Sequence, residues 1–338
     1  MVRTLSSGVM RSIIVILSAL FLTAASAAAQ TIAPQAAHWS VAPTFGKNAD
    51  ARKNISGAAC APTQPPFHSC LAVNDQKRYA QFFSINGEKI VPGALILLLS
   101  EHSVSDPDAE GAAFHDGYFY VTGSHGVGRT SGKDNSSFTV FRFKVNAQTG
   151  KPAFEVTDRE VVRQIEKSTT LRAALRKADI IGPHAEKALN ENGMNIEGIA
   201  LDSGRIYFGF RGPSLDGRGF IMSTKIEGLF GVGVEPLDAK LHPLALGEIT
   251  GIRDLARVDG GLLVLTGAVN EQDIVPAVYL WTPASGALKK LGDLGDTPHN
   301  AKAETILVLE QQPQRYRVLV MYDGPADGQP KEYWLPRE

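Results

Sequence analysis

The sequence predicts an all-β fold, a β-propeller, from a repeated six-residue motif and from the strand-like segments that follow its copies. Asn195–Ala200 (NIEGIA) aligns with Asp108–Ala113 (DAEGAA) and with Asn54–Ala59 (NISGAA). Looser copies lie at Ile252–Ala256 and Lys302–Ile306. Repeated units built only of strands are typical of propeller blades. We therefore expect five blades, with six as the alternative if the long segment before Asn195 holds another.

The spacing of the copies supports this interpretation. The aligned positions 56, 110, 197, 254 and 304 give steps of 54, 87, 57 and 50 residues. A period of roughly 50 residues suits blades of four strands each. Apolar strands follow every copy but the first, at Tyr118–Ser124, Ile206–Arg211, Leu262–Gly267 and Tyr316–Tyr322.

The step of 87 residues predicts an insertion around residues 158–190. Apolar residues recur there at helical spacing, first at Val161, Val162 and Ile165 and then at Leu171 and Leu175. A helical insertion accounts for the residues in excess of the period. It lies either over one mouth of the central channel or on the outer wall.

The last unit offers only three strands, at Ala303–Leu309, Tyr316–Tyr322 and Lys331–Leu335. We expect Trp39–Phe45 to supply the fourth. Such a closure by both ends of the chain would remove open sheet edges, which otherwise favour aggregation. Residues 30–338 are then a single propeller domain.

Residues 1–29 resemble a secretory signal peptide. Two arginines precede the apolar run Ile13–Leu22, which is too short to span a bilayer, and small residues at Ala27–Ala29 or Ala25–Ala27 offer a cleavage site. We expect a periplasmic or secreted protein without a membrane span after cleavage. An uncleaved N-terminal anchor is the alternative.

The charge of the chain argues against a nucleic-acid partner. Residues 1–29 hold two arginines and no acidic residue, so their removal leaves 32 basic and 35 acidic residues and a formal net charge of −3. A nucleic-acid-binding surface requires a basic excess. We expect a small-molecule ligand or a protein partner instead.

The two cysteines, Cys60 and Cys70, are expected to form a disulfide because an even number of cysteines in an exported chain favours one. Cys60 ends the first strand of the first unit and Cys70 begins the next strand, so the two can face each other. Two free buried thiols are the alternative.

Two glycine-rich segments do not fit nucleotide-binding motifs. Gly123–Ser137 lacks the first glycine of a phosphate-binding loop, and Gly228–Gly233 lacks the strand–helix context of a dinucleotide fingerprint. We expect no nucleotide cofactor.

Repeated acidic positions predict a polar site at one end of the channel. The first strand of each unit begins, and the second ends, at the same rim, so Glu110, Glu197, Asp254 and Glu304 should surround one mouth. Strand interiors are depleted in Asp and Glu, so four such positions need an explanation. The same rim should carry two candidate catalytic residues, His125 and Arg211, and four candidate substrate-binding residues, His102, Asp108, Asn195 and His299.

Three hypotheses explain the repeated carboxylates. They bind Ca²⁺ or Mg²⁺, which polarises a substrate while His125 or a carboxylate acts as the base and Arg211 stabilises a developing anion. Alternatively, they bind a ligand or partner without chemistry. In the third hypothesis they tie blades together by accepting hydrogen bonds from backbone amides, although Ser56 breaks the pattern in the first unit.

The stretch from Asn195 to Pro213, with IEGIA followed by YFGFRGP, resembles a signature of the bacterial family called domain of unknown function 3616. Asp108–Ala113 and Ser56–Ala59 are similar to the same pattern. The resemblance implies a secreted β-propeller, similar to esterase-like phytases and strictosidine-synthase-like propellers, with Glu110, Glu197 and Arg211 on recurrent positions. It implies no established activity.

The working function is a metal-dependent hydrolase of a small anionic ester, lactone or phosphate. The alternative is a non-catalytic ligand-binding or scaffold propeller. Both place the functional residues at the mouth where the first strands begin.

Overall fold

The computed structural model describes residues 1, 30–61, 65–67, 69–100, 103, 106–128, 136–152, 154–156, 163–231 and 236–337. The expected signal peptide at residues 1–29, apart from Met1, lies outside the described residues. The same is true of the candidate substrate-binding residue His102.

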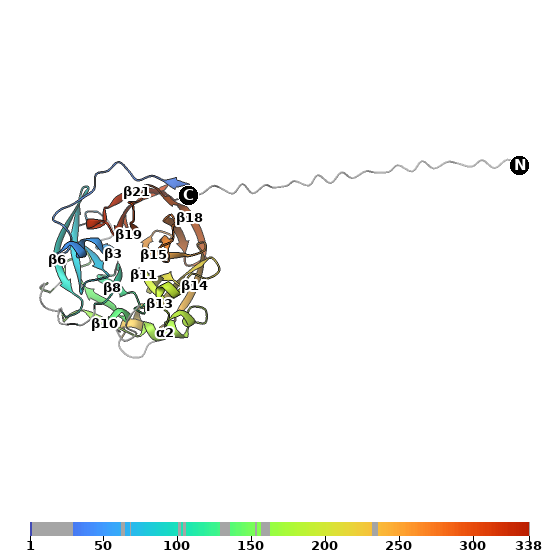
Figure 1. Cartoon of the computed structure of the whole chain (residues 1–338), viewed down its shortest axis with the longest axis horizontal. Coiled ribbons are helices and arrows are strands. Elements are labelled where there is room, and N and C mark those ends of the chain that lie inside the picture. Colours follow the sequence, from blue (N-terminus) through green and yellow to red (C-terminus); the bar gives the residue numbers. More distant parts are fainter. Residues whose placement is uncertain are drawn as a thin grey trace.

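Five antiparallel sheets stand around a central axis (Figure 1), which confirms the predicted propeller and the count of five blades. Blade 1 consists of β3 (Ile55–Ala61), β4 (Ser69–Asn74), β5 (Tyr79–Asn86) and β6 (Lys89–Leu97). Blade 2 consists of β7 (Ala109–His115), β8 (Tyr118–Gly123), β9 (Val140–Lys144) and β10 (Glu166–Ser168). Blade 3 consists of β11 (Asn195–Asp202), β12 (Arg205–Gly212), β13 (Arg218–Lys225) and β14 (Lys240–Ala245).

Blades 4 and 5 differ in their number of strands. Blade 4 consists of β15 (Thr250–Val258), β16 (Gly261–Ala268), β17 (Ala277–Thr282) and β18 (Ala287–Leu294). Blade 5 has only β19 (Lys302–Gln311), β20 (Arg315–Asp323) and β21 (Lys331–Pro336) among the described residues. The first strand of each blade is innermost. Each inner strand contacts those of the two neighbouring blades, and β19 contacts β3, so the ring is closed.

The prediction that Trp39–Phe45 adds a fourth strand to blade 5 is wrong. Ser40–Val41 forms β2 and pairs in parallel with β6 of blade 1, whereas Thr31–Ile32 forms β1 and pairs with β18 of blade 4. The segment between them crosses the outer edge of blade 5, where the Gln35 amide donates a hydrogen bond to the Glu332 carbonyl (2.8 Å). Because the segment connects blade 4 to blade 1, it crosses β21 and does not pair with it as a fourth strand of blade 5.

The helical insertion is confirmed over part of its predicted range. Within residues 158–190, α2 (Leu171–Lys177) and the 3₁₀ turn η2 (Gly182–His184) are helical, whereas residues 166–168 form the outer strand β10, and residues 158–162 lie outside the described part. Leu171 and Leu175 of α2 are fully buried in a cluster with Ile196 and Phe208 of blade 3. The helix lies at the circumference (Figure 1), so the insertion packs on the outer wall. The remaining short helices are α1 (Ala49–Lys53), α3 (Ile226–Phe230), η1 (Ser136–Phe138), η3 (Leu189–Glu191) and η4 (Ala326–Gly328).

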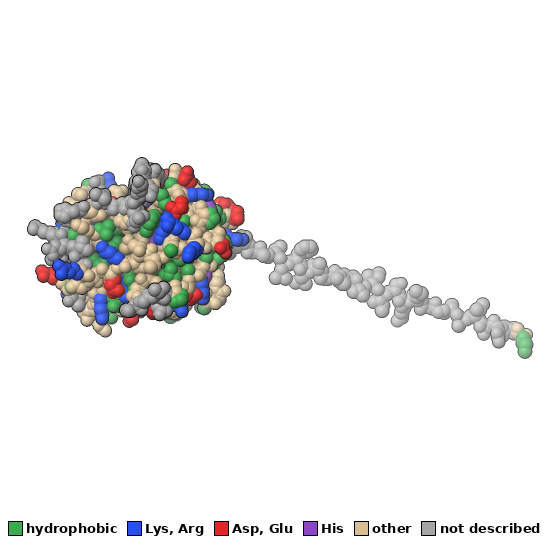
Figure 2. Space-filling model, turned by 90° about the horizontal axis from the view of Figure 1, so that it is seen from below, with side chains coloured by type: hydrophobic (Ala, Val, Ile, Leu, Met, Phe, Trp, Pro, Cys, Tyr) green, Lys and Arg blue, Asp and Glu red, His purple; other side chains and the backbone are tan. Residues whose placement is uncertain are grey.

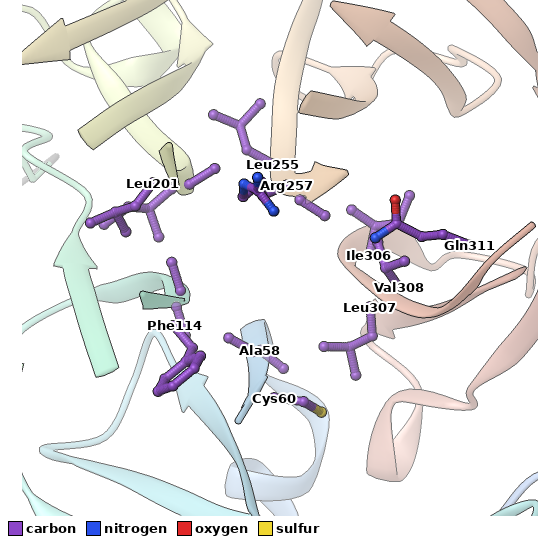
Figure 3. Close-up of a pocket in the computed structure, with 16 residues that line it drawn as sticks. Ala58, Cys60, Phe114, Leu201, Leu255, Arg257, Ile306, Leu307, Val308 and Gln311 are labelled. Carbon is purple, nitrogen blue, oxygen red and sulfur yellow. The ribbon is translucent and has the colours of Figure 1, made fainter. Parts of the chain in front are cut away.

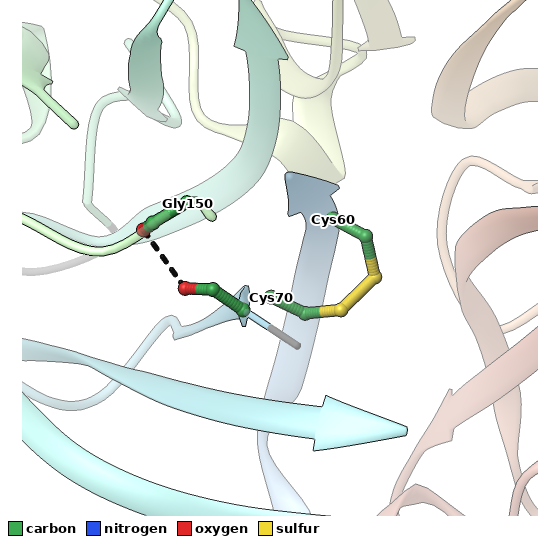
Figure 4. The surroundings of a disulfide bond; sticks show 4 residues. Cys60, Cys70 and Gly150 are labelled. Carbon is green, nitrogen blue, oxygen red and sulfur yellow. Dashed lines mark hydrogen bonds between the residues drawn. A yellow bond between two sulfur atoms is a disulfide. The ribbon is translucent and has the colours of Figure 1, made fainter. Parts of the chain in front are cut away.

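The predicted disulfide is present. Cys60 on β3 and Cys70 on β4 are direct cross-strand partners, and their sulfurs lie 1.98 Å apart (Figure 4). Beside them, Ser69 Oγ donates a hydrogen bond to the Gly150 carbonyl (2.8 Å). Gly150 has a φ of 65°, and a Cβ there would lie 2.5 Å from the Ala61 carbonyl oxygen, so this contact between blades 1 and 2 requires glycine.

In the described part of the chain, no helix has both the length and the apolar character to cross a membrane. Figure 2 shows one side of the molecule, on which basic and acidic side chains are interspersed.

Candidate functional site

Every inner strand begins with a one-residue bulge at the same end of the channel. In each, one residue has no partner on the second strand of its blade, because the pairing register shifts around it. These residues are Ser56, Glu110, Glu197, Arg253 and Glu304, which we call the bulge ring. Bulges commonly re-aim a side chain at a functional rim.

In blade 4 the ring residue is Arg253, and the alignment that placed Asp254 there is off by one. Ile252 pairs with Thr266 and Asp254 pairs with Leu265, which leaves Arg253 as the extra residue. The ring therefore combines three carboxylates, one guanidinium and one hydroxyl. The sequence signal for Arg253 is its place after Ile252, which matches the place of Glu197 after its own isoleucine.

The glycine that follows the ring residue in blades 1 to 3 lets adjacent inner strands touch. A Cβ on Gly111 would lie 2.5 Å from the Glu197 carbonyl oxygen of the next blade. A Cβ on Gly57 would lie 2.7 Å from the Gly111 Cα, and one on Gly198 would lie 3.0 Å from the Asp254 carbonyl carbon. The glycine of the repeated motif is therefore a packing requirement of the ring of blades.

Asp254 occupies this glycine position in blade 4 and joins blade 4 to blade 5. Its Oδ1 accepts a hydrogen bond from the Leu255 amide and its Oδ2 accepts one from the Ile306 amide, both at 2.8 Å. The residue is 1% exposed, and burial raises its pKa well above the usual range. Both oxygens serve backbone amides, as the structural hypothesis expects, and this favours a structural role over metal binding.

The positive charge of Arg253 balances the negative charges of two carboxylates of the bulge ring. Its Nε lies 2.9 Å from Glu197 Oε2, and its Nη2 donates to Glu304 Oε1. Burial lowers its pKa to about 10, so it remains protonated at neutral pH. Glu197 also accepts a hydrogen bond from Arg211 Nη1 (2.9 Å), while Arg211 Nε donates to the Val269 carbonyl (2.6 Å). Glu197 and Glu304 are thus held in ion pairs.

Glu110 is the ring carboxylate without such a partner. Among the described residues, no hydrogen bond or ion pair reaches its carboxyl group, and its exposure is 8%. Burial raises its pKa well above the usual range, and the nearby charges of Asp108 and Glu197 raise it further. A buried carboxyl without a cation is costly unless it stays protonated.

Two aspartates interact electrostatically with Glu110 and, like it, have no ion-pair partner among the described residues. Burial raises the pKa of Asp108 to about 6, although Ser124 Oγ donates a hydrogen bond to its Oδ2. Asp75, which follows β4, was not predicted from the sequence. Burial and the charge of Asp108 raise its pKa to about 7, and its Oδ1 is buried without a hydrogen-bond partner among the described residues. We call Asp75, Asp108 and Glu110 the acid group.

His125 is not placed to act as a base. Its ring is fully buried and stacked on Phe138, with the ring centroids 6.2 Å apart, and burial lowers its pKa to about 3. Its backbone carbonyl accepts a hydrogen bond from Arg172 Nη1 (2.7 Å). Its surroundings are those of a neutral core residue between the blade and α2.

Asn195 and His299 lie at different parts of this mouth. Asn195 is 9% exposed, and its Oδ1 has no hydrogen-bond partner in the described part of the chain. His299 is exposed and lines a cavity of about 760 Å³ between blades 4 and 5, together with Arg253 and Lys302. The mouth therefore has an acidic side over blades 1 and 2 and an open cavity over blades 4 and 5.

The opposite end of the channel is lined mainly by residues with apolar side chains. A cavity of about 90 Å³ lies there, lined by inner-strand residues such as Ala113, Ala200 and Leu307, with Arg257 and Gln311 also among its lining residues (Figure 3). Cys60 also lines it. The charged residues of the bulge ring lie at the other end of the same strands, so the two ends of the channel differ in chemistry.

The predicted metal-binding residues do not fit a metal ion as a set. Glu197 and Glu304 are paired with Arg253, and both Asp254 oxygens accept hydrogen bonds from backbone amides. In the described part of the chain, no three His, Cys, Asp or Glu side chains converge closely enough to hold one. Calcium takes about six to eight oxygen ligands at short distances.

Five blades around a charged bulge ring define the chain as a five-bladed β-propeller with an acidic mouth. The family model described as "Protein of unknown function (DUF3616)" matches residues 142–333, more than half of the chain. The chain therefore belongs to this family, as the resemblance of Asn195–Pro213 indicated. No curated protein shows significant sequence similarity to it.

Solved structures resemble the chain at low identity. Glutaminyl cyclase from Myxococcus xanthus has a TM-score of 0.42 and 13% identity, over 91% of this chain and 98% of that one. The periplasmic gluconolactonase of Pseudomonas aeruginosa has a TM-score of 0.38 and 16% identity, over 84% and 87%. A luciferin-regenerating enzyme has a TM-score of 0.40 and 9% identity, over 83% and 75%. These values carry no information about activity.

Proposed function

We propose that the protein is a hydrolase of a small ester or lactone and that Asp108 and Glu110 of the acid group carry the chemistry. The observation behind this proposal is a pair of neighbouring carboxyls, Glu110 buried and Asp108 partly buried, whose pKa values are both raised, beside one guanidinium. Two carboxyls with different pKa values provide an acid and a base at the same pH. Asp108, with a pKa of about 6, is mostly ionised at neutral pH, whereas burial raises the pKa of Glu110 well above its usual range and so favours its protonated form.

The roles follow from these protonation states. Asp108 accepts a proton from water as the oxygen of that water attacks the carbonyl carbon. Glu110 donates its proton to the departing alkoxide oxygen, so that an acid and an alcohol are released. Arg211 supplies the electrophilic contact. Its Nε and Nη1 are engaged, and among the described residues no acceptor is found for its Nη2, which is free to bind the developing oxyanion.

The charge of the site changes the expected substrate. The negative charges of Asp108, Asp323, Glu197 and Asp106 all act on Asp75 at this mouth. Arg211 and Arg253, in contrast, are already paired with Glu197. An anionic ester or a phosphate would be repelled. A neutral or cationic ester or lactone fits better, and the proposal needs no metal ion.

The test is hydrolysis of a panel of aryl esters, aliphatic lactones and sugar lactones by the purified protein. For any substrate turned over, Asp108→Asn and Glu110→Gln are each expected to lower kcat about 10²–10⁴-fold, the range of general acid–base catalysis. Asp202→Asn, on the same strand as Glu197 but at its far end, is the matched control and should retain activity.

The pH dependence is a further expected result. Because the base must be deprotonated and the acid protonated, kcat/KM should fall about tenfold per unit below pH about 6, level off above it, and fall again at the pH at which Glu110 loses its proton. A chelator should leave activity unchanged. Full activity in Asp108→Asn would contradict the proposed base, loss of activity on chelation would restore the metal-dependent hypothesis, and no turnover of any ester or lactone would favour the non-catalytic ligand-binding propeller.

A further inference from the structure

Two hydrogen-bond acceptors at the mouth have no donor. Asp75 Oδ1 and Asn195 Oδ1 are both buried, and neither has a hydrogen-bond partner among the described residues. Leaving a buried acceptor unpaired costs about 1–3 kcal/mol. Neither oxygen has a role in the proposed hydrolysis, so both need another explanation.

Both acceptors lie around Asp108. Asp75 comes from blade 1, and its charge interacts with those of Asp108 and Glu197. Asn195 comes from blade 3. A Cβ on Gly126 would lie 3.4 Å from its Nδ2 and 3.3 Å from Ser124 Oγ, the hydroxyl that donates to Asp108. Asp75 and Asn195 therefore approach the proposed base from two different blades.

A ligand that satisfies these groups must bring donors and positive charge. The guanidinium whose charge acts on Asp108, that of Arg211, already donates to Glu197 and to the Val269 carbonyl through its Nη1 and Nε. An organic cation fits better than a metal ion, because no three carboxylates or imidazoles of the described chain converge on one point. An ammonium group offers three N–H donors that reach oxygens about 2.7–2.9 Å away.

We propose that this site binds a primary ammonium group, with Asp75 and Asn195 as its acceptors. Asp75 provides a carboxyl group that a bound cation stabilises in its ionised form, and Asn195 Oδ1 provides a neutral acceptor. The inference rests on the proposed hydrolase function for the identity of the rest of the ligand: it makes the substrate an ester or lactone that carries an amine beside its carbonyl group.

Binding is tested without turnover, by calorimetry and thermal shift with n-butylammonium. Tetramethylammonium, which has the charge but no N–H donor, and butanoate are the comparison probes, and CaCl₂ tests a metal ion. Asp75→Asn is expected to weaken n-butylammonium binding about ten- to hundredfold, the effect of losing one charged hydrogen bond. Asn195→Asp should strengthen it, and Asp259→Asn, an exposed turn residue at the other end of the channel, should leave it unchanged.

Equal binding of tetramethylammonium, wild-type affinity in Asp75→Asn, or a Ca²⁺-specific rise in melting temperature in place of the ammonium effect would each overturn the inference. The two proposals fail separately. Ammonium binding without hydrolysis of any ester would contradict the hydrolase proposal and support the ammonium site. Hydrolysis of neutral esters without ammonium binding would support the hydrolase proposal and contradict the ammonium site.

Discussion

Replacing Arg253 with methionine is expected to lower the free energy of unfolding by about 3–5 kcal/mol, the usual cost of leaving buried charges unpaired. Arg253 is 1% exposed and contacts both Glu197 and Glu304. Methionine fills a similar volume but supplies no charge, so Glu304 would have no cation and Glu197 would retain only Arg211. Urea denaturation followed by far-UV circular dichroism measures the change.

Arg257→Met is the matched control, because Arg257 lies on the same strand and also pairs with an acid of blade 3. Its Nε lies 2.8 Å from Asp202 Oδ1, but its side chain is 52% exposed. Such a surface pair contributes about 0–1 kcal/mol. A triple variant with Arg253→Met, Glu197→Gln and Glu304→Gln should recover much of the lost stability. A loss below 1 kcal/mol in Arg253→Met alone would contradict the neutralising role of Arg253.

Gly111→Ala is expected to destabilise the protein by about 2–4 kcal/mol, because the new methyl group forces two backbones apart. Its Cβ would lie 2.5 Å from the Glu197 carbonyl oxygen and 3.0 Å from Ile199 Cγ2 on the neighbouring inner strand. Backbone atoms of a closed ring of blades have little freedom to move. The free energy of unfolding from urea titration is again the measurement.

Gly93→Ala controls for the loss of a strand glycine as such. Gly93 lies on β6, is exposed, and would place a Cβ 3.5 Å from the Phe82 carbonyl oxygen, which is an ordinary contact. Its effect should stay within about 0.5 kcal/mol, as for most surface substitutions. If Gly111→Ala behaved like Gly93→Ala, close approach would not explain the repeated glycine.

The fold was predictable because its signals are local and repeated. The motif at Asn195–Ala200 recurs with apolar strands after it, and Cys60 and Cys70 flank a strand turn in a chain expected to be exported. The path of the N-terminal segment was not predictable, since its pairing with β6 and β18 depends on where three blades lie in space.

The position of Glu110, Glu197 and Glu304 at one end of the inner strands was predicted, whereas the ring residue of blade 4 was not. The alignment followed the acidic residue in blade 4, so it chose Asp254, whereas the bulge follows the isoleucine and selects Arg253. Asp75 was missed because the alignment followed the repeated motif, and Asp75 lies outside it, after the second strand of the first unit. The burial of His125 depends on Phe138 and Arg172, which approach it only in the folded chain.

Some carboxylates of the mouth hold the structure together, whereas Glu110 has no ion-pair partner. This distinction is tested most directly by the stability of Glu110→Gln at two pH values. A carboxyl whose pKa is raised by folding binds more protons in the native than in the unfolded state between the two pKa values, so wild-type stability falls as pH rises through that interval. Glutamine removes this effect while keeping the shape of the side chain.

Urea denaturation of the wild type and of Glu110→Gln at pH 4.5 and pH 8 is the measurement. At pH 4.5 the two should agree within about 0.5 kcal/mol, and at pH 8 the variant should be the more stable, because the raised pKa of Glu110 lowers the stability of the wild type there. Such a gain means that Glu110 is retained at a cost to stability, as functional carboxyls often are. A variant less stable than the wild type at pH 8 would show that the ionised Glu110 holds the blades together, and would contradict its role in the acid group.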